Sequence, residues 1–477
     1  MEAGYQLFKD DETPLYIQAA RAVRARILDG ELRLGDRLPS VRGLSDELGV
    51  NPATVVAAYR ILTREGFIVA KAGSGAFVAP DAPVDGAVGE PSAAFPASER
   101  PLADGSSGAV DLAANAPPLD MFPLVDMKRF IVEAIDADGG KAFEYQDTGG
   151  YRPLRVAMAE RLAARGRPGS VDPFDVHIVS GAQQGIDLAA RILLRPGDVA
   201  AVENPGYRGA RDAFVAAGAR VEPVPVDSGG LDLDALEALA RSRPLRLVHV
   251  NPGFQNPTCV VYTAERRSAL ASMAERYGFY VLEDDQLAEL SWDGSMPPAV
   301  RDFDEAGRVI LVKSTSKCLM PGLRIAFLEA PTALRSRFEA VKRSIDISSN
   351  GLMQRALERF IASGRFDEHI AAARDRYRAA YGAFDAALAP CRSLGLSWAP
   401  PGGGLNLWLA LPSGVSARSF ASSCLAAGCV LAPEASFRHE AAEPERADSH
   451  LRVSFGSAPL ESLSSAAMAM AAVARRL

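Results

Sequence analysis

The strongest chemical signal in the sequence is a lysine placed between serines and an arginine. Lys317 lies one residue after Ser316, three after Ser314 and seven before Arg324. A lysine amine that is held rigidly can form a Schiff base with an aldehyde. The hydroxyls and the planar, paired donors of the arginine can bind a dianionic phosphate. Lys313 lies in the same segment, but its spacing to serine and arginine is wrong, so Lys317 is the predicted nucleophile.

A glycine-containing turn offers further phosphate ligands. Ser180 and Gly181 follow an apolar run, and Ala182 and Gln183 open a stretch with helical character. Backbone N–H groups at a helix N-terminus attract anions. We therefore expect Gly181, Ala182 and Gln183 to contact the same phosphate as the serines.

The elements that must position these groups form an α/β pattern. From Asp111 onward, short apolar runs alternate with helical segments, which predicts a mostly parallel sheet covered on both faces. A later stretch is typical of a smaller C-terminal α+β lobe. The expected strands cover residues 176–179, 245–250, 280–282 and 309–312 in the sheet and 405–411 and 451–455 in the lobe, and the clearest helices cover 264–277 and 359–387.

Together these motifs resemble the fold-type I aminotransferases, in which a lysine carries pyridoxal 5'-phosphate. The resemblance rests on the Ser-x-Ser-Lys run, the Asn-Pro-Gly-Tyr loop ending at Tyr207, and the run Asn-Pro-Gly-Phe-Gln-Asn-Pro-Thr that contains Asn256. It implies that Tyr207 stacks on the pyridine ring and that Asn256 bonds its phenolic oxygen. It also implies that Asp284 keeps the ring nitrogen protonated, with Asp285 as the alternative.

The same resemblance implies a dimer and an effector site. Tyr145 lies in a segment whose tyrosine, in the family, reaches the phosphate held by the neighbouring subunit. Arg452 lies on a strand whose arginine grips the substrate α-carboxylate. An internal salt bridge is the alternative for Arg452, because an unpaired buried charge is costly. Asn115 lies where relatives contact substrate. We therefore expect a head-to-tail homodimer that binds a small amino compound.

Two departures from the family pattern bear on activity. Gln286 and Leu287 occupy the positions where relatives carry a tyrosine that bonds the phenolic oxygen, and Cys259 replaces the usual glycine. Without that phenol the internal imine is less well tuned. This favours ligand sensing over turnover, so we expect the fold to serve as a sensor and the protein not to be an enzyme.

The first 80 residues carry a separate pattern. Helices are expected over Leu15–Leu28, from Ser40 to Gly49 and from Asn51 to Glu65, with Ser40 and Asn51 as N-caps. Two short strands follow around a glycine-rich turn. This order is the winged helix-turn-helix plan. The third helix has no acid on its exposed face before Glu65, which suits a groove lined by phosphates.

This zone resembles the DNA-binding domain of the GntR family of bacterial regulators. The matching features are a Leu-Pro-Ser-x-Arg run ending at Arg42, a Gly-Val-Asn turn ending at Asn51, and a wing that contains Gly73. The resemblance implies that Arg42, Asn51, Thr54 and Gly73 contact double-stranded operator DNA. The alternative is that these polar residues form the solvated face of a protein-interaction module.

The bulk composition fits a chain in two parts. Its 477 residues exceed what one core organises, and its net charge of −7 confines any contact with nucleic acid to a local basic surface. Residues 81–109 are rich in Ala, Pro, Gly and Ser, which predicts a flexible linker between domains 1–80 and 110–477. The cysteines and histidines do not cluster and no run could span a bilayer, so we expect no metal, no membrane and a reduced, cytoplasmic compartment.

The order of these parts resembles the MocR subfamily of GntR regulators. That resemblance implies a pyridoxal 5'-phosphate-dependent transcription factor. An amino compound would displace Lys317 to form an external aldimine, and this exchange would change DNA affinity. Three alternatives remain open: an active aminotransferase, a regulator that senses the cofactor itself, and a DNA-binding protein whose large domain only dimerises.

Overall fold

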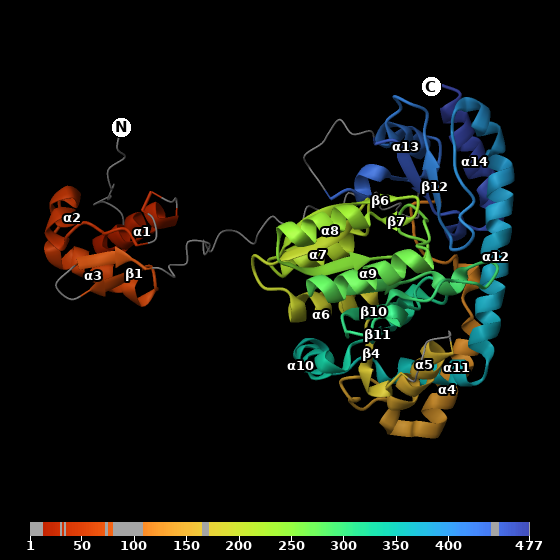
Figure 1. Ribbon diagram of the computed structural model, residues 1–477, viewed down its shortest axis with the longest axis horizontal. Helices are drawn as coiled ribbons and strands as arrows, with labels where there is room; N and C mark the ends of the chain where they lie inside the picture. Colours follow the sequence, from red (N-terminus) through yellow and green to blue (C-terminus); the bar gives the residue numbers. More distant parts are fainter. Residues whose placement is uncertain are drawn as a thin grey trace. The chain divides into compact units, whose positions relative to one another are not determined.

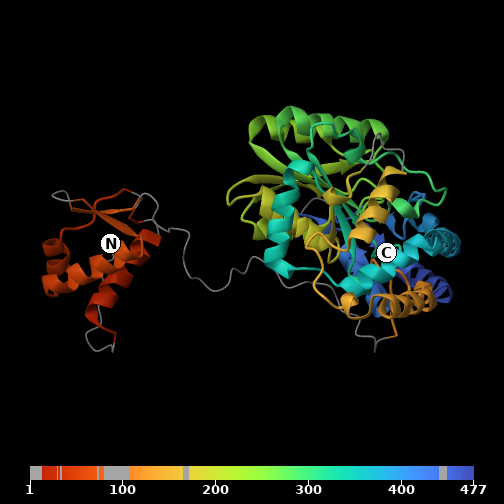
Figure 2. The same ribbon diagram turned by 90° about the horizontal axis from the view of Figure 1, so that it is seen from below.

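The computed structural model of the protein describes residues 13–28, 31–32, 35–71, 75–79, 108–164, 171–439 and 448–476. The chain divides into two compact units, Met1–Ala97 and Ser98–Leu477 (Figures 1 and 2). The predicted DNA contact Gly73 lies outside the described residues, as does the predicted linker 81–109 apart from its last two residues.

The smaller unit contains three helices and a β-hairpin. Helices α1 (Leu15–Leu28), α2 (Val41–Leu48) and α3 (Pro52–Arg64) precede β1 (Ile68–Lys71) and β2 (Gly75–Val78), which pair antiparallel. This is the predicted winged helix-turn-helix arrangement. The helices and the hairpin bury one shared core, whose members include Ala19, Val23, Leu38, Leu44, Val55, Ala58, Leu62, Phe67 and Val78.

Side-chain caps fix where two of these helices begin. Ser40 Oγ accepts a hydrogen bond from the N–H of Gly43 at 3.1 Å, and Asn51 Oδ1 accepts one from the N–H of Ala53 at 2.8 Å. Both predicted N-caps are thus confirmed, and such a cap stabilises a helix by about 1 kcal/mol. Gly49 ends α2 with a φ of 62°, a conformation that glycine adopts without strain.

The larger unit is built on an eight-stranded sheet with the order β4-β11-β10-β9-β8-β5-β6-β7. Strands β10, β9, β8, β5 and β6 are parallel, whereas β11 and β7 run antiparallel to their neighbours. This confirms the predicted mixed, mostly parallel sheet. The strands are β4 (Val176–Val179), β5 (Val199–Asn204), β6 (Arg220–Asp227), β7 (Gly230–Leu231), β8 (Leu245–Val250), β9 (Tyr280–Asp285), β10 (Val309–Ser314) and β11 (Ala326–Glu329).

Helices cover both faces of this sheet because neighbouring residues of each central strand point to opposite sides. On β9, for example, Leu282 packs with α6, α7 and α10, whereas Val281 packs with α8 and α9. The helices are α4 (Leu124–Asp138), α5 (Arg152–Ala163), α6 (Ala182–Leu193), α7 (Arg208–Ala216), α8 (Leu233–Ser242), α9 (Ala264–Tyr277), α10 (Arg335–Asp346) and α11 (Gly351–Ala362).

A smaller α+β lobe completes the unit, as expected. Its three-stranded antiparallel sheet has the order β12-β15-β14, and β13 pairs in parallel with β3. Helix α12 runs beside the large sheet from α11 to α14 in the lobe (Figure 1). The elements are β3 (Val110–Asp111), α12 (Arg365–Leu388), β12 (Leu407–Ala410), α13 (Ala417–Ala426), β13 (Cys429–Val430), β14 (Ala432–Pro433), β15 (His450–Val453) and α14 (Leu460–Ala474).

Two predicted strands can be compared with the observed ones residue by residue. β9 begins with the apolar run predicted at 280–282 and ends with the acids Glu283, Asp284 and Asp285, which pair with β10. β12 is shorter than the predicted 405–411. Within the described residues, no helix combines the length and the apolar character that crossing a membrane requires.

One close packing contact of the fold can be tested at Gly150. Its φ is +107°, and a Cβ there would lie 2.3 Å from Ile178 Cγ1. Gly150→Ala should therefore lower the free energy of unfolding of the larger unit by about 1–3 kcal/mol from overpacking alone. Gly140→Ala is the matched control, since a Cβ there has no neighbour within 4 Å. Urea unfolding followed by tryptophan fluorescence measures both; equal stability of the two variants would contradict the described contact.

Candidate functional site

A cavity of about 330 Å³ brings together most of the residues predicted to bind the cofactor or the effector. The predicted residues that line it are Asn115, Ala182, Gln183, Tyr207, Asn256, Asp284, Ser314, Ser316, Lys317, Arg324 and Arg452. Arg208, Gln286, Pro321, Ser436 and Phe437 complete its lining. Gly181 lies directly beside Ala182 at the start of α6.

The loop after β10 holds Lys317 in place. Ser314 Oγ accepts a hydrogen bond from the N–H of Ser316 at 3.1 Å, and Thr315 Oγ1 donates to the carbonyl of Ile325 at 2.6 Å. From α12, the hydroxyl of Tyr377 donates to the carbonyl of Lys317 at 3.0 Å. The lysine amine itself donates to the carbonyl of Asn115. The backbone on both sides of the lysine is thus fixed by contacts that leave its amine in the cavity.

Lys313, the rival lysine, lies elsewhere. Its ammonium is buried and lies 3.3 Å from Asp285 Oδ2 and 3.4 Å from Glu289 Oε1. It does not line the cavity that contains Lys317. The geometry therefore agrees with the choice of Lys317 that the spacing predicted.

The two candidate acids of β9 have different environments because successive strand residues face opposite sides. Asp284 lines the cavity and is only 3% exposed, and its Oδ1 has no hydrogen-bond partner among the described residues. Its Oδ2 lies 3.8 Å from Nε2 of His249. Asp285 instead pairs with Lys313 and accepts the N–H of Ala288 at 3.0 Å. Asp284 is thus the acid that can face a cofactor.

The phosphate-binding end of the cavity is formed where α6 begins. No side chain caps this helix, so its first N–H groups can bind an anion. Gly181 leaves room for the nearby guanidinium, since a Cβ there would lie 2.3 Å from Arg324 Nη2. Arg324 also donates to the carbonyl of Ser180 at 2.7 Å. The predicted phosphate ligands are therefore adjacent to one another.

Tyr207 closes one side of the cavity. Its hydroxyl donates to Gln183 Oε1 at 2.9 Å, and its ring centroid lies 6.4 Å from that of His249. Burial, together with the charge of Asp284, raises the pKa of Tyr207 to about 12, so the phenol stays neutral. His249 is buried between Tyr207 and Asp284, and neither ring nitrogen has a hydrogen-bond partner among the described residues. The sequence analysis did not single out His249, because this residue lies within an apolar strand and no recognisable motif surrounds it.

Arg452 and Asn256 contact each other directly. Arg452 donates to Asn256 Oδ1 at 2.9 Å and to the carbonyl of Ala113 at 2.6 Å, and it lies over the ring of Phe437 at 4.8 Å. These three partners are an amide, a carbonyl and an aromatic ring. The arginine is only 7% exposed, and these contacts direct it into the cavity.

Gln286, at one of the two positions where the family pattern has tyrosine, joins a scaffold of amides. Its Nε2 donates to Asn251 Oδ1 at 3.2 Å, and the same oxygen accepts the N–H of Asn256 at 2.8 Å. Leu287 is buried in the apolar core away from the cavity. Among the described residues that line the cavity, Tyr207 is the only phenol. Cys259 follows this scaffold with a φ of 64°, the conformation that favours glycine.

The structure places two further predicted residues, Asn115 and Tyr145, differently with respect to the cavity. Asn115 lies on the segment that follows β3, and its Oδ1 accepts the amide of Asn406 at 3.1 Å. Tyr145 is 81% exposed and does not line the cavity of its own chain. Sequence reasoning did not single out Arg208, Ser436 and Phe437 either. Adjacency to Tyr207 could have indicated Arg208, but the sequence carries no signal for the other two.

In the smaller unit, the described DNA candidates lie at the start of α2 and α3. Arg42 and Asn51 are exposed and Thr54 is half-buried. Because Asn51 Oδ1 caps α3, only its amide N–H₂ remains for another partner. Residues 15–78 carry nine basic and six acidic side chains, which is a local positive excess in a chain of net charge −7. A basic surface of this kind suits a polyanion.

Two family models match the chain. "Aminotransferase class I and II" matches residues 107–469, and "Bacterial regulatory proteins, gntR family" matches residues 15–78. The fold and the cavity thus define a class of protein in which a gntR-type DNA-binding unit precedes an aminotransferase-type unit. Pyridoxal 5'-phosphate is the cofactor of the aminotransferase class.

Similar proteins include both regulators and enzymes. The probable rhizopine catabolism regulatory protein MocR of Rhizobium meliloti is 33% identical over 78% of this chain and 76% of its own length. The transcriptional regulator TauR of Rhodobacter capsulatus is 33% identical over 85% of this chain and 86% of its own. The α-aminoadipate aminotransferase LysN of Thermus thermophilus, solved with N-(5'-phosphopyridoxyl)-L-leucine, has a TM-score of 0.70 and 30% identity over 78% of this chain and 94% of its own. The chain belongs to the MocR subfamily of GntR-family regulators.

The residues present fit pyridoxal 5'-phosphate. A buried carboxylate oxygen without a partner, on Asp284, matches the need of a protonated ring nitrogen. At the other end, the space above Gly181 would be filled by any Cβ and is bordered by Arg324 and the start of α6. These features give the cavity a site for a ring nitrogen and a site for a phosphate.

The different surroundings of Asp284 and Asp285 can be tested by substitution. Asp284→Asn should weaken binding of pyridoxal 5'-phosphate by about tenfold or more, because a neutral amide cannot pair with a protonated ring nitrogen. Asp285→Asn should leave that affinity within about twofold but lower the melting temperature, because it breaks a buried ion pair with Lys313. Absorbance titration with the cofactor and thermal unfolding separate the two effects. The reverse pattern would contradict the assignment.

A pH-dependent stability is expected from Glu283. Burial raises the pKa of its carboxyl from 4.5 to about 7 in the folded chain. A group whose pKa is raised by folding contributes its full stabilisation below the unfolded pKa and loses it as pH rises through the folded pKa. The stability of the wild type relative to Glu283→Gln should therefore fall between about pH 5 and about pH 8. Urea unfolding at both pH values measures this, and a pH-independent difference would show that Glu283 is ionised throughout.

Proposed function

We propose that this PLP-dependent transcriptional regulator senses a small amino compound in the cavity that contains Lys317. The observation that carries the proposal is that one cavity holds both a lysine amine and the guanidinium of Arg452. Bound pyridoxal 5'-phosphate supplies an aldehyde carbon that bonds reversibly to amines. Arg452 would bind a carboxylate of the effector, while the effector amine competes with the lysine for that carbon.

Charges in the cavity support an anionic or zwitterionic effector. Lys317, Arg208, Arg324 and Arg452 line it as cations, whereas Asp284 is the acid among the described lining residues. A cofactor phosphate would compensate Arg324, and a protonated ring nitrogen would compensate Asp284. Arg208, which lies 3.8 Å from Asp212, and Arg452 are the other cations of the lining that an effector carboxylate would meet.

The residues around Asn256 bear on whether the chain only regulates or also retains enzyme activity. Regulators among the relatives support sensing, whereas aminotransferases among them keep turnover as the second candidate. Gln286 supplies an amide, already bonded to Asn251, at a position where the family pattern has a phenol. An amide cannot act as an acid or base near neutral pH, so this chain offers weaker support for complete transamination.

A homodimer is proposed because apolar side chains stay exposed on one part of the larger unit. They lie on the turn Leu119–Met121, on α4, on the stretch that ends at Tyr145 and just after α10, where the N–H of Gln146 donates to Ser348 Oγ. In a head-to-tail dimer, Tyr145 would reach the phosphate held by the other subunit. The most exposed of these side chains are Leu119, Leu124, Val125, Phe143, Tyr145 and Ile347.

DNA contacts are proposed for the exposed start of the helix-turn-helix. Arg42 on α2 would bind a phosphate or a base edge, and Thr54 and the amide of Asn51 would bind at the start of α3. Gly73 is kept as a proposed wing contact. Because its proposed partner is double-stranded operator DNA, we propose that this protein acts in the cytoplasm.

The test combines cofactor absorbance with DNA affinity. A panel of amino acids and ω-amino acids is first screened for compounds that change the absorbance of the PLP-loaded dimer. Binding to duplexes from the promoter of its own gene is then measured by fluorescence anisotropy. At least one such amine should change DNA affinity by about fivefold or more. Lys317→Ala should bind DNA but lose this response.

Controls separate sensing from its alternatives. Arg42→Ala should lose DNA affinity and keep the absorbance change. An unchanged response in Lys317→Ala would exclude sensing through this lysine. Continuous production of a 2-oxo acid without any change in DNA affinity would support the aminotransferase. A change in DNA affinity on adding the cofactor alone would support a sensor of the cofactor itself.

A further inference from the structure

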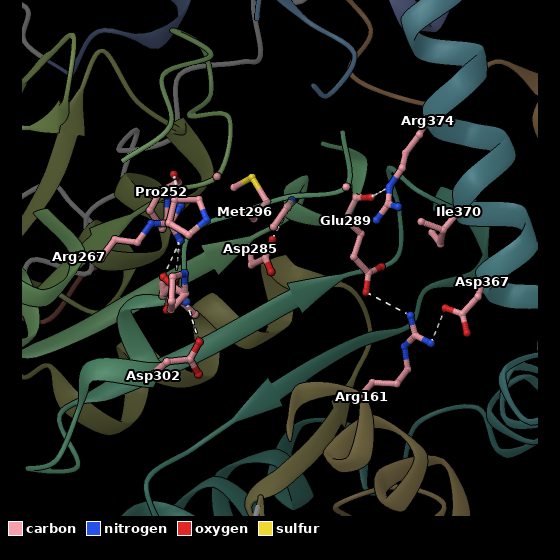
Figure 3. A pocket seen from close by; sticks show the side chains of 17 residues that line it. Arg161, Pro252, Arg267, Asp285, Glu289, Met296, Asp302, Asp367, Ile370 and Arg374 are labelled. Carbon is pink, nitrogen blue, oxygen red and sulfur yellow. Dashed lines mark hydrogen bonds and ion pairs between the residues drawn. The ribbon is translucent and has the colours of Figure 1, made fainter. Parts of the chain in front are cut away.

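Figure 3 shows the lining of a second cavity, of about 370 Å³, which the alternation of side chains along β9 places on the other side of that strand from the cofactor cavity. Glu283 and Asp285 line it, whereas Asp284 between them lines the cofactor cavity. The same alternation of side chains along β9 gives Asp284 and Asp285 their different surroundings. Nothing in the proposed sensing mechanism uses this second space.

The acids that line this cavity already have hydrogen-bond or ion-pair partners within the chain. Glu283 accepts the N–H groups of Val300 and Arg301 at 3.0 and 2.9 Å. Asp285 and Glu289 both pair with the ammonium of Lys313. An added cation would therefore have to displace existing partners.

The remaining acids are likewise occupied. Arg161 donates to Asp367 at 2.8 Å and lies 3.6 Å from Glu289, and Figure 3 shows it between these two carboxylates. Asp302 accepts the N–H of Ala299 at 2.7 Å. The acids thus leave no evident place for a cationic ligand.

Arg374 differs from these groups. Its Nε donates to the carbonyl of Glu289 at 2.7 Å, as Figure 3 shows. Among the described residues, no carboxylate lies within 4.0 Å of its guanidinium. Gly294 leaves space beside it, since a Cβ there would lie 3.3 Å from Nη1. The two terminal nitrogens can therefore bind an oxyanion with paired hydrogen bonds.

Apolar side chains complete the lining next to this guanidinium. Ile370 lies one helical turn before Arg374 on α12. Met296, Pro297 and Pro298 come from the connection between β9 and β10, in the loop between the short 3-10 turns Ala288–Leu290 and Val300–Phe303. Among the charged groups of this lining, Arg374 is the guanidinium that lies beside apolar side chains, and such a combination favours an organic ion over an inorganic one. The volume of the cavity is sufficient for a body of several carbon atoms.

We propose that this second cavity binds a small organic carboxylate, with its carboxylate on Arg374 and its apolar body against Ile370 and Met296. The site lies on the helix that also holds the lysine loop. His369 Nε2 lies 2.8 Å from the carbonyl of Cys318, and the Tyr377 hydroxyl bonds the carbonyl of Lys317. A ligand bound to Arg374 thus contacts the same helix that positions the cofactor lysine.

The experiment titrates the PLP-loaded protein with butanoate, 3-methylbutanoate and hexanoate, observed by ligand NMR. Arg452→Met is used as the background so that the proposed effector site cannot bind the carboxylate. At least one of the three should bind saturably, whereas 3-methyl-1-butanol should not. Arg374→Met should weaken binding by about tenfold or more, because it removes a charge-assisted pair of hydrogen bonds. Arg374→Lys should retain part of the affinity.

Arg378→Met is the matched control, because Arg378 is exposed on the same helix and does not line the cavity. It should leave carboxylate binding unchanged. Cofactor absorbance and melting temperature verify that each variant is folded. The proposal is overturned if none of the three carboxylates binds saturably, or if Arg374→Met binds them as tightly as Arg378→Met does.

Discussion

A buried carboxylate oxygen without a hydrogen-bond partner is costly, and the described lining of the cofactor cavity contains one. Asp284 is almost completely buried, and one of its oxygens has no hydrogen-bond partner among the described residues. A protonated ring nitrogen compensates such a charge, and the compensation is strongest where water is excluded. The requirement for a cationic partner at this point determines how the ring of a cofactor is oriented. Lys317, Arg324 and Tyr207 would surround a cofactor ring that is held in that orientation.

The alternation of side chains along β9 and β10 gives the central sheet two separate polar compartments. One side has Asp284 and Ser314 in the cofactor cavity, and the other has Asp285 paired with Lys313. A shift of one residue in strand register would exchange these sets and bring the wrong lysine and the wrong acid to the cofactor. Burial of both faces under helices prevents such a shift, because it would also turn apolar side chains away from their cores.

Much of this arrangement could be predicted from the sequence, because local patterns determine it. Capping residues such as Ser40 and apolar runs such as that of β8 predicted element types correctly, and the spacing around Lys317 distinguished it from Lys313. The contacts between distant segments could not be predicted. The proximity of His249 to Asp284, the contact of Phe437 with Arg452 and the surroundings of the Arg374 guanidinium depend on tertiary packing that leaves no local signal.

The lysine amine in the cavity, and not the amine of its buried neighbour Lys313, is expected to bond to the cofactor. The most direct measurement is reduction of the PLP-loaded protein with borohydride, followed by mass spectrometry of its peptides. We expect a phosphopyridoxyl group on Lys317 alone. The amine of Lys317 lines the cavity, whereas the ammonium of Lys313 is held by two carboxylates. A label on Lys313, or no labelled lysine at saturating cofactor, would contradict it.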